Sequence, residues 1–161
     1  MDFTLHHPVD AAVDDVAAAL LDADFQASLA DVGGLKSREV LEQKEGAGGT
    51  VLRRTRCVLG RDLGAAKRFL GNSEPAWVEE ARWNPDDLTW SWRILPEVAA
   101  DLLSASGTTV LHADGDGTER VVAGTVKVKV PLYGSRVEGV IVRGLEEAYS
   151  EEAERLQAWL T

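Results

Sequence analysis

The sequence predicts an α+β domain in which an antiparallel sheet of about seven strands packs against one long C-terminal helix. Two observations carry this prediction. Three pairs of strand-like segments are each joined by turn-forming residues, and the final segment has the apolar spacing of a helix. With 161 residues, the chain is long enough for one domain with a substantial core.

The predicted C-terminal helix begins at Ser135 and runs to Leu160, directly after an extended stretch. Ser135 and Glu138 have the spacing of a capping box. If it is helical throughout, the segment spans roughly 39 Å. It can then lie across a whole sheet and enclose a cavity. The apolar residues of its expected buried stripe are Val137, Ile141, Leu145, Ala148, Leu156 and Leu160.

The chain is expected to open with a strand over Asp2–His6 and two helices. Pro8 suits the first position of the first helix, and Asp24 suits the cap of the second, which Gly33-Gly34 would end. Apolar residues spaced for these helices are Val9, Val13, Val16 and Leu20 in the first, and Phe25, Leu29 and Val32 in the second.

Six further strands are predicted as three hairpins, over Leu35–Lys44 and Thr50–Leu59, Ala76–Trp83 and Leu88–Leu95, and Gly107–Ala113 and Thr118–Leu132. In the last strand Val122, Val126, Val128 and Val130 share one face, opposite Lys127 and Lys129. This alternation indicates a sheet that is buried on one side. Helical turns are expected around Ala65–Leu70 and Glu97–Leu103. Their connections, Arg61–Pro75 and Pro96–Ser106, either cover the mouth of a cavity or form plain surface loops.

Composition argues against several classes of function. A formal net charge of −10 disfavours nucleic-acid binding, and the basic cluster Arg53, Arg54 and Arg56 is interpreted as a solvated strand face. No apolar run is long enough to span a membrane, and the start of the chain lacks the pattern of a secretory signal, so a cytoplasmic location is expected. Cys57, the single cysteine, is expected to pack as a small hydrophobe. No metal or cofactor site is predicted.

The order of the predicted elements resembles the helix-grip fold of the START-like (SRPBCC) superfamily, which includes the birch-pollen allergen, polyketide cyclases and lipid-transfer domains. The ending V-K-V-P-L-Y-G-S-R-V-E-G-V-I and the opening F-T-L-H-H-P-V-D are similar to an uncharacterised bacterial family within it. The resemblance covers nearly the full length. It implies a curved antiparallel sheet wrapped around the long helix, with an apolar cavity between them.

The candidate ligand site centres on tryptophans. Trp90, Trp92 and Ile94 alternate along one strand and therefore share a face, which either belongs to the packed core or lines a pocket. Two helix glycines, Gly139 and Gly144, indicate close approach of the sheet, empty volume, or a neutral solvated face. The residues predicted to contact a ligand are Trp90, Trp92, Ile94, Val126, Val128, Ile141, Leu145 and Tyr149.

Catalytic arrangements find little support in the sequence. His112 is expected to be a partly buried or edge histidine, and Glu79, Glu80 and Glu97 have no spacing that marks an acid–base pair. None of the common hydrolase, metalloprotease or phosphate-loop motifs occurs.

Three functions remain open. The first is non-catalytic binding or carriage of a small apolar molecule, such as a lipid or polyketide-like compound. The second is a cyclase- or aromatase-type enzyme, for which His112, Tyr149 and Arg93 are the groups to examine. The third is a protein-interaction module with a filled interior. A homodimer is compatible with each of them.

Overall fold

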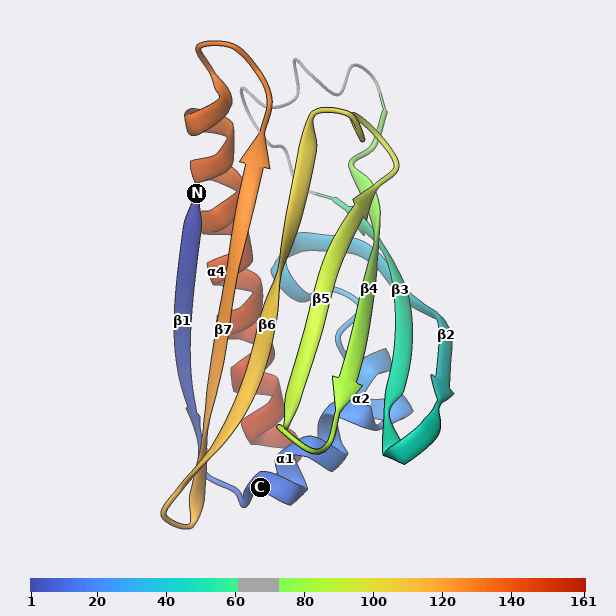
Figure 1. The fold of residues 1–161 in the computed structure, drawn as a ribbon, viewed down its shortest axis with the longest axis vertical. Helices are drawn as coiled ribbons and strands as arrows, with labels where there is room; N and C mark the ends of the chain where they lie inside the picture. The colour runs from blue at the N-terminus through green and yellow to red at the C-terminus, as the bar shows by residue number, and fades with distance from the viewer. Residues whose placement is uncertain (61–72) are drawn as a thin grey trace.

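The computed structural model describes residues 1–60 and 73–161, as Figure 1 shows. The elements in order are β1 (Asp2–Val9), α1 (Val13–Leu21), α2 (Ala23–Ser28), the 3-10 helix η1 (Val32–Gly34), β2 (Leu35–Glu45), the 3-10 helix η2 (Ala47–Gly49), β3 (Val51–Leu59), β4 (Ala76–Asn84), β5 (Thr89–Pro96), β6 (Leu103–Asp114), β7 (Gly117–Val128) and α4 (Gly134–Trp159).

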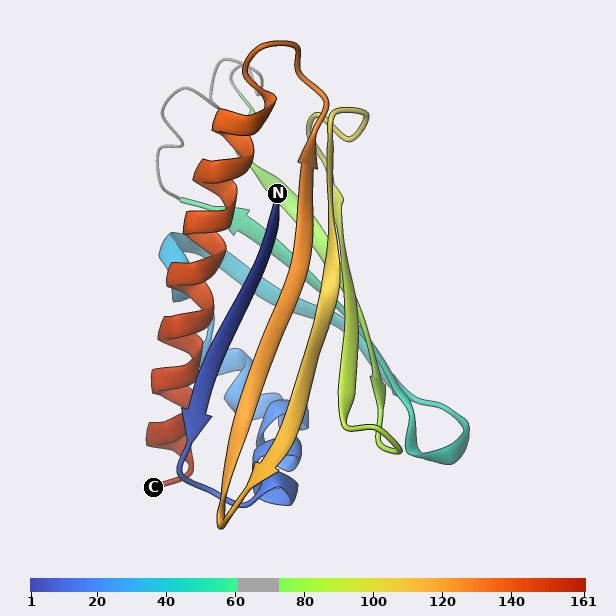
Figure 2. The ribbon, with the colours of Figure 1, turned by 60° about the vertical axis from the view of Figure 1, so that its left-hand side comes forward.

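The seven strands form one curved sheet in the order β1-β7-β6-β5-β4-β3-β2, and each pairs antiparallel with its neighbours. Figure 2 shows α4 along one face of this sheet, beside β1 and β7, while α1 and α2 lie near the C-terminal end of α4. The predicted helix-grip fold is confirmed. The space between the sheet and α4 is therefore the place to look for a site.

Alternation along the strands explains which face meets the helix. In β7, Val122 and Val126 are fully buried, whereas Lys127 is exposed. In β3 every second residue from Val51 to Cys57 is buried, namely Val51, Arg53, Thr55 and Cys57, and Val58 near the end of the strand is buried as well. Successive side chains of a strand point to opposite faces. The inner face therefore carries charged residues as well as apolar ones.

The start of the chain differs from the prediction. Pro8 lies in β1 opposite Glu119 rather than opening a helix. Because β1 is an edge strand, a residue without a backbone N–H is tolerated there. The cap of α2 is Asp22, not Asp24: its carboxylate accepts hydrogen bonds from the backbone nitrogens of Asp24 and Phe25, at 2.8 and 3.0 Å.

The long helix begins at Gly134, within one residue of the prediction, but the predicted capping box is absent. Glu138 instead lies 3.3 Å from the terminal nitrogen of Met1. Val137 and Leu156 are buried, and Ile141 and Leu145 are half-buried against the core, so the expected stripe faces inward. Val142, which was not predicted, is buried as well.

The connection between β5 and β6 is a turn rather than the expected helical turn. Ala99 has the left-handed φ of 57°, and its carbonyl accepts hydrogen bonds from the nitrogens of Leu102 and Leu103. β6 then begins at Leu103. The helical turn expected around Ala65–Leu70 lies outside the described residues.

Gly33 allows the close contact between η1 and α4. Gly33 has a φ of 63°, and a Cβ atom on it would lie 2.6 Å from the Cβ of Ala148. Such a contact is too short for any larger residue, so the close approach requires glycine here. The η1 segment thereby packs on α4 beside the space between helix and sheet.

Candidate functional site

A cavity of about 270 Å³ lies between the sheet and α4. The inward side chains of β3 to β7 form one wall, α4 forms the opposite wall, and residues of α2, η1 and β2 contribute as well. Val98, Ala99 and Leu102 of the β5–β6 turn line one end. Of the two alternatives that the sequence left open for this connection, that position fits the cavity mouth rather than the plain surface loop. Most lining side chains are apolar.

Trp92 belongs to the sheet-side wall, and two glycines make room for its indole. It lies opposite Gly107 of β6, which in turn lies opposite Gly124 of β7. A Cβ atom on Gly124 would lie 2.8 Å from the Trp92 ring, and one on Gly107 would lie 2.6 Å from it. The ring therefore lies flat over both strands, stacked on Phe3 at 6.3 Å and 6.4 Å from Tyr149 of α4.

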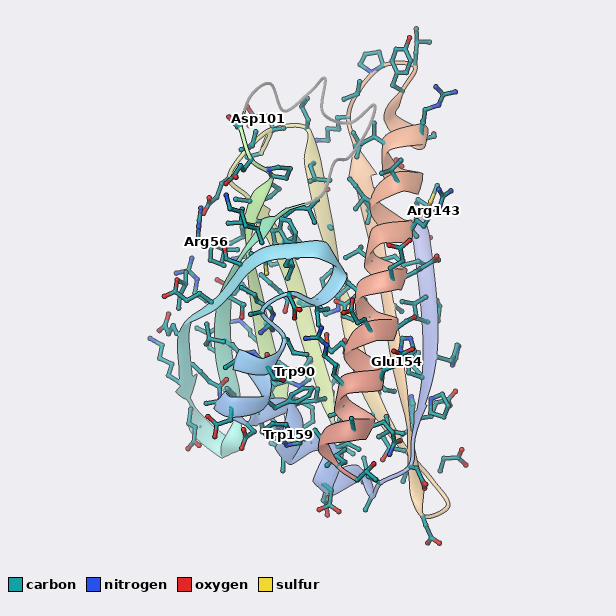
Figure 3. All side chains as sticks on the ribbon, turned by 180° about the vertical axis from the view of Figure 1, so that it is seen from behind. Arg56, Trp90, Asp101, Arg143, Glu154 and Trp159 are labelled. Carbon is teal, nitrogen blue, oxygen red and sulfur yellow. The ribbon has the colours of Figure 1, made fainter. Side chains whose placement is uncertain are left out.

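Trp90 lies two residues earlier, near α1 and α2, as Figure 3 shows. Its ring contacts Trp83 at 5.5 Å and carries the guanidinium of Arg53 at 4.3 Å above its face. Trp90 and Trp92 are 4% and 5% exposed, and both line the cavity. The structure therefore fits both interpretations of the tryptophan face, because Trp90 and Trp92 belong to the packed core and also line the cavity.

The structure brings together most of the residues that were predicted to contact a ligand. Those that line the cavity are Trp90, Trp92, Ile94, Val128, Ile141, Leu145 and Tyr149. Val126 does not line it and is fully buried within the core. Gly144 lines the cavity, which agrees with its interpretation as a site of empty volume, whereas a Cβ on Gly139 would meet only the Met1 side chain, at 3.7 Å. Contact with a ligand stays a prediction.

One end of the cavity is polar. Arg53, which was interpreted as part of a solvated face, is 7% exposed, so that interpretation is wrong for this residue. Its Nη1 donates to the carbonyl oxygen of Leu20 at 2.7 Å and to Gln43 Oε1 at 3.5 Å. Burial lowers the pKa of Arg53 to about 10, so it stays protonated at neutral pH. Arg56 does lie on the outer face, paired with Glu97.

Arg120 of β7 lies in the same part of the wall and is 2% exposed. Its Nη2 donates to Glu152 of α4 at 2.7 Å, and its guanidinium lies 5.4 Å from the ring centre of Tyr149. Burial raises the pKa of Tyr149 well above its ordinary value, so the phenol is neutral. These contacts join the sheet to the helix across the polar end.

Glu79 of β4 completes this end of the cavity. Within the part of the chain that the structure describes, its carboxyl has no hydrogen bond and no ion pair. Burial raises the pKa of Glu79, although the positive charges of Arg38 and Arg53 act in the opposite direction. Because its pKa is raised, Glu79 keeps its proton to a higher pH than an exposed glutamate does, and its carboxyl group is a candidate for proton transfer.

Two groups proposed for catalysis lie outside the cavity. His112 is exposed, and its strand β6 lies between β5 and β7, so it is neither the partly buried nor the edge histidine that was expected; it sits near the turn between β6 and β7. Arg93 points to the outer face and donates to Glu80 at 2.9 Å. Of the three groups named for an enzyme, Tyr149 alone lines the cavity.

The charged residues of the inner face could have been found from alternation alone. Glu79 lies between Trp77 and Ala81 at a spacing of two, and Arg120 precedes Val122 by two. Strand periodicity assigns both to the buried face, but the sequence analysis considered Glu79 only as a possible acid–base residue and did not consider Arg120. Cys57 also lines the cavity, where burial raises its thiol pKa to about 12, as expected for a packed cysteine.

Solved structures share this architecture at low sequence identity. The protein TTHA0849 from Thermus thermophilus is 20% identical, with a TM-score of 0.71 over 100% of both chains. The Zhui aromatase/cyclase from a Streptomyces species is 15% identical, with a TM-score of 0.69 over 99% of this chain and 93% of that one. A STAR-related lipid transfer protein from Xanthomonas axonopodis is 15% identical, with a TM-score of 0.65 over 97% and 85%.

Among curated proteins the chain has no significant match. The structural likenesses establish the START-like helix-grip fold, which the sequence resemblance implied. The model of one sequence family matches residues 4–160. By that match over almost its whole length, the chain belongs to the family described as "Protein of unknown function (DUF2505)".

Proposed function

We propose that this protein binds and carries a small apolar molecule in the cavity between the sheet and α4. The observation that carries the proposal is a space of about 270 Å³ with mostly apolar walls, to which the rigid Trp92 ring contributes. Apolar pockets with a few convergent polar groups are the usual form of small-molecule sites. An aromatase/cyclase and a STAR-related lipid transfer protein with the same fold support this proposal.

The test is a titration with a neutral fluorescent probe, N-phenyl-naphthylamine, read by quenching of tryptophan emission. We expect saturable binding. Leu145→Phe, which places a larger side chain in the cavity, should weaken it strongly, whereas Leu41→Phe, on the exposed part of β2, should not. Trp92→Phe should weaken binding by about 1 kcal/mol, since it removes part of a rigid contact surface. Unchanged binding to the Leu145→Phe variant would place the site elsewhere.

A cyclase-type enzyme is a second candidate, which the Glu79 carboxyl in the cavity wall, with its raised pKa, favours. In such an enzyme the pocket shape folds a reactive chain and Glu79 moves a proton. The test is incubation of a poly-β-ketone with the protein and with Glu79→Gln, followed by mass spectrometry. A cyclised product formed by the unsubstituted protein alone would support the enzyme, and recovery of the unchanged compound from both would favour the carrier.

A further inference from the structure

We propose that the cavity takes an amphiphile with an acidic head group, whose carboxylate lies at the polar end beside Arg53 and whose apolar tail extends toward the β5–β6 turn. This inference rests on the proposed function, because it names the class of molecule that the same cavity would hold. It starts from the hydrogen-bonding groups that the cavity wall leaves without partners.

Every fully shielded polar atom without a partner among the described lining residues is a donor, while the unpartnered carboxyl group of Glu79 belongs to a residue that is only half-buried. These atoms are Arg53 Nε, Arg120 Nε, Arg120 Nη1 and Trp92 Nε1. Buried polar groups in native proteins are nearly always satisfied, and an unmet donor raises the free energy of the folded state. A ligand with hydrogen-bond acceptors would pair with these donors, and a ligand that has only donors would leave them without partners.

The charged groups at the polar end also favour an acidic head group. Three guanidinium groups, of Arg38, Arg53 and Arg120, line the cavity together with two carboxyl groups, of Glu79 and Glu152. These described lining residues thus carry an excess of positive charge, although the whole chain carries −10. A buried charge without a counter-charge is costly, so the site favours an anion over a neutral or cationic head group.

Arg53 is the residue best placed to bind that anion. Both of its hydrogen bonds to described residues leave from Nη1 and go to the uncharged oxygens of Leu20 and Gln43. Its Nε has no partner among those residues. Arg120 differs, because its Nη2 is already paired with Glu152. A guanidinium with a free edge binds carboxylates strongly and with defined geometry.

Glu79 determines how such binding depends on pH. An ionised Glu79 would repel a second carboxylate, but its protonated form can donate a hydrogen bond to it. Binding should therefore be coupled to proton uptake by Glu79, whose pKa is already raised by burial. The charged and titratable groups that face it are Arg38 of β2, Arg53 and Cys57 of β3, Arg120 of β7, and Tyr149 and Glu152 of α4.

The opposite end of the cavity is suited to the tail. Its walls come from Leu103, Val128, Val137 and Ile141, together with the apolar residues of the β5–β6 turn. The cavity volume of about 270 Å³ is close to the lower end of the range for small-molecule pockets, about 300–1,000 Å³. A medium-chain acid fits this size, and decanoate is a suitable probe.

The test is calorimetric titration with decanoate, decanol and decylamine, which share a tail and differ in the head group. We expect decanoate to bind at least about tenfold more tightly than decanol, because charge-assisted hydrogen bonds are the strong ones. Arg53→Met should reduce the affinity for decanoate to that for decanol and leave decanol binding unchanged. Arg53→Lys should restore part of the preference. The control Arg56→Met removes the same charge from the outer face of the same strand and should change neither affinity.

Glu79→Gln keeps the proposal testable if Arg53→Met fails to fold. In the unsubstituted protein the affinity for decanoate should rise as pH falls through the pKa of Glu79, and in Glu79→Gln this dependence should disappear. Equal binding of decanoate and decanol, or tighter binding of decylamine, would overturn the acidic head group and leave the proposed function standing. Failure of all three compounds to bind would overturn both.

Discussion

Glu79 places a carboxyl group in the wall of a largely apolar cavity. Burial raises its pKa, so between the ordinary glutamate pKa and this raised value the folded protein binds a proton that the unfolded chain has released. The stability contributed by the protonated group is complete at low pH and is lost as pH rises through the folded pKa. Above its raised pKa, ionised Glu79 destabilises the fold.

The first prediction concerns this residue. Glu79→Gln, which has the same shape without the charge, should melt at a higher temperature than the unsubstituted protein at neutral pH. The difference should vanish at a pH below the ordinary glutamate pKa of about 4.3. Thermal unfolding followed by circular dichroism across pH measures both. A lower melting temperature at neutral pH would mean that attraction to Arg38 and Arg53 outweighs the cost of burial.

The second prediction concerns Cys57. Its thiol is buried and has a pKa of about 12, so very little of it is thiolate at neutral pH. A chromogenic disulfide reagent should label the folded protein far more slowly than the protein unfolded in guanidinium chloride. Labelling of the folded protein at the rate of a free thiol would show that Cys57 is accessible and ionised.

At the scale of strands, the Trp92 ring fits against the sheet only because two paired residues, Gly107 of β6 and Gly124 of β7, have no side chain. The third prediction is that Gly107→Ala destabilises the fold by about 1–3 kcal/mol, as overpacking of a close contact does. Its Cβ would overlap the carbonyl oxygen of Ala123 and meet the Trp92 ring. Denaturant unfolding measures the effect.

Gly139 on α4 provides the matched control. A Cβ there would touch only a flexible methionine side chain, so Gly139→Ala should stabilise the helix by up to about 1 kcal/mol. If Gly107→Ala proved as harmless as Gly139→Ala, Trp92 would not be held against the sheet as described.

At the scale of the long helix, two leucines on one stripe have different surroundings. Leu156 is fully buried in the core, whereas Leu145 is half-buried and borders the cavity. The fourth prediction is that Leu156→Ala costs about 2–5 kcal/mol in the free energy of unfolding and Leu145→Ala distinctly less. Truncation at Leu145 enlarges an existing space and removes fewer contacts. Equal costs in chemical denaturation would indicate that Leu145 packs in a filled interior.

Across the whole molecule, the sequence predicts the arrangement of elements better than the chemistry of the interior. Hairpin turns and the spacing of Val137, Ile141 and Leu145 are local signals, and they predict the sheet and the helix that lies over it. Helix starts were less predictable because alternative caps compete: the cap of α2 is Asp22 rather than Asp24, and Glu138 pairs with the terminal nitrogen of Met1 instead of capping.

The polar end of the cavity was missed for a physical reason. Charged residues such as Arg53 and Arg120 normally lie in solvent, and their burial depends on partners from distant strands and from α4. The sequence interpretation of Arg53 therefore relied on its charge and not on its position in the alternation of the strand. The apolar lining was found because Trp90, Trp92 and Ile94 satisfy both signals at once.

No helix of the described residues is long and apolar enough to cross a membrane.

We propose that the space between the sheet and α4 holds a ligand, and a crystal structure of the protein with decanoate would locate it. We expect continuous density inside the cavity, with the tail near Val128 and Ile141 and the carboxylate beside Arg53. Density only on the outer surface, with the side chains of Ile141 and Leu145 packed tightly against the sheet, would contradict it.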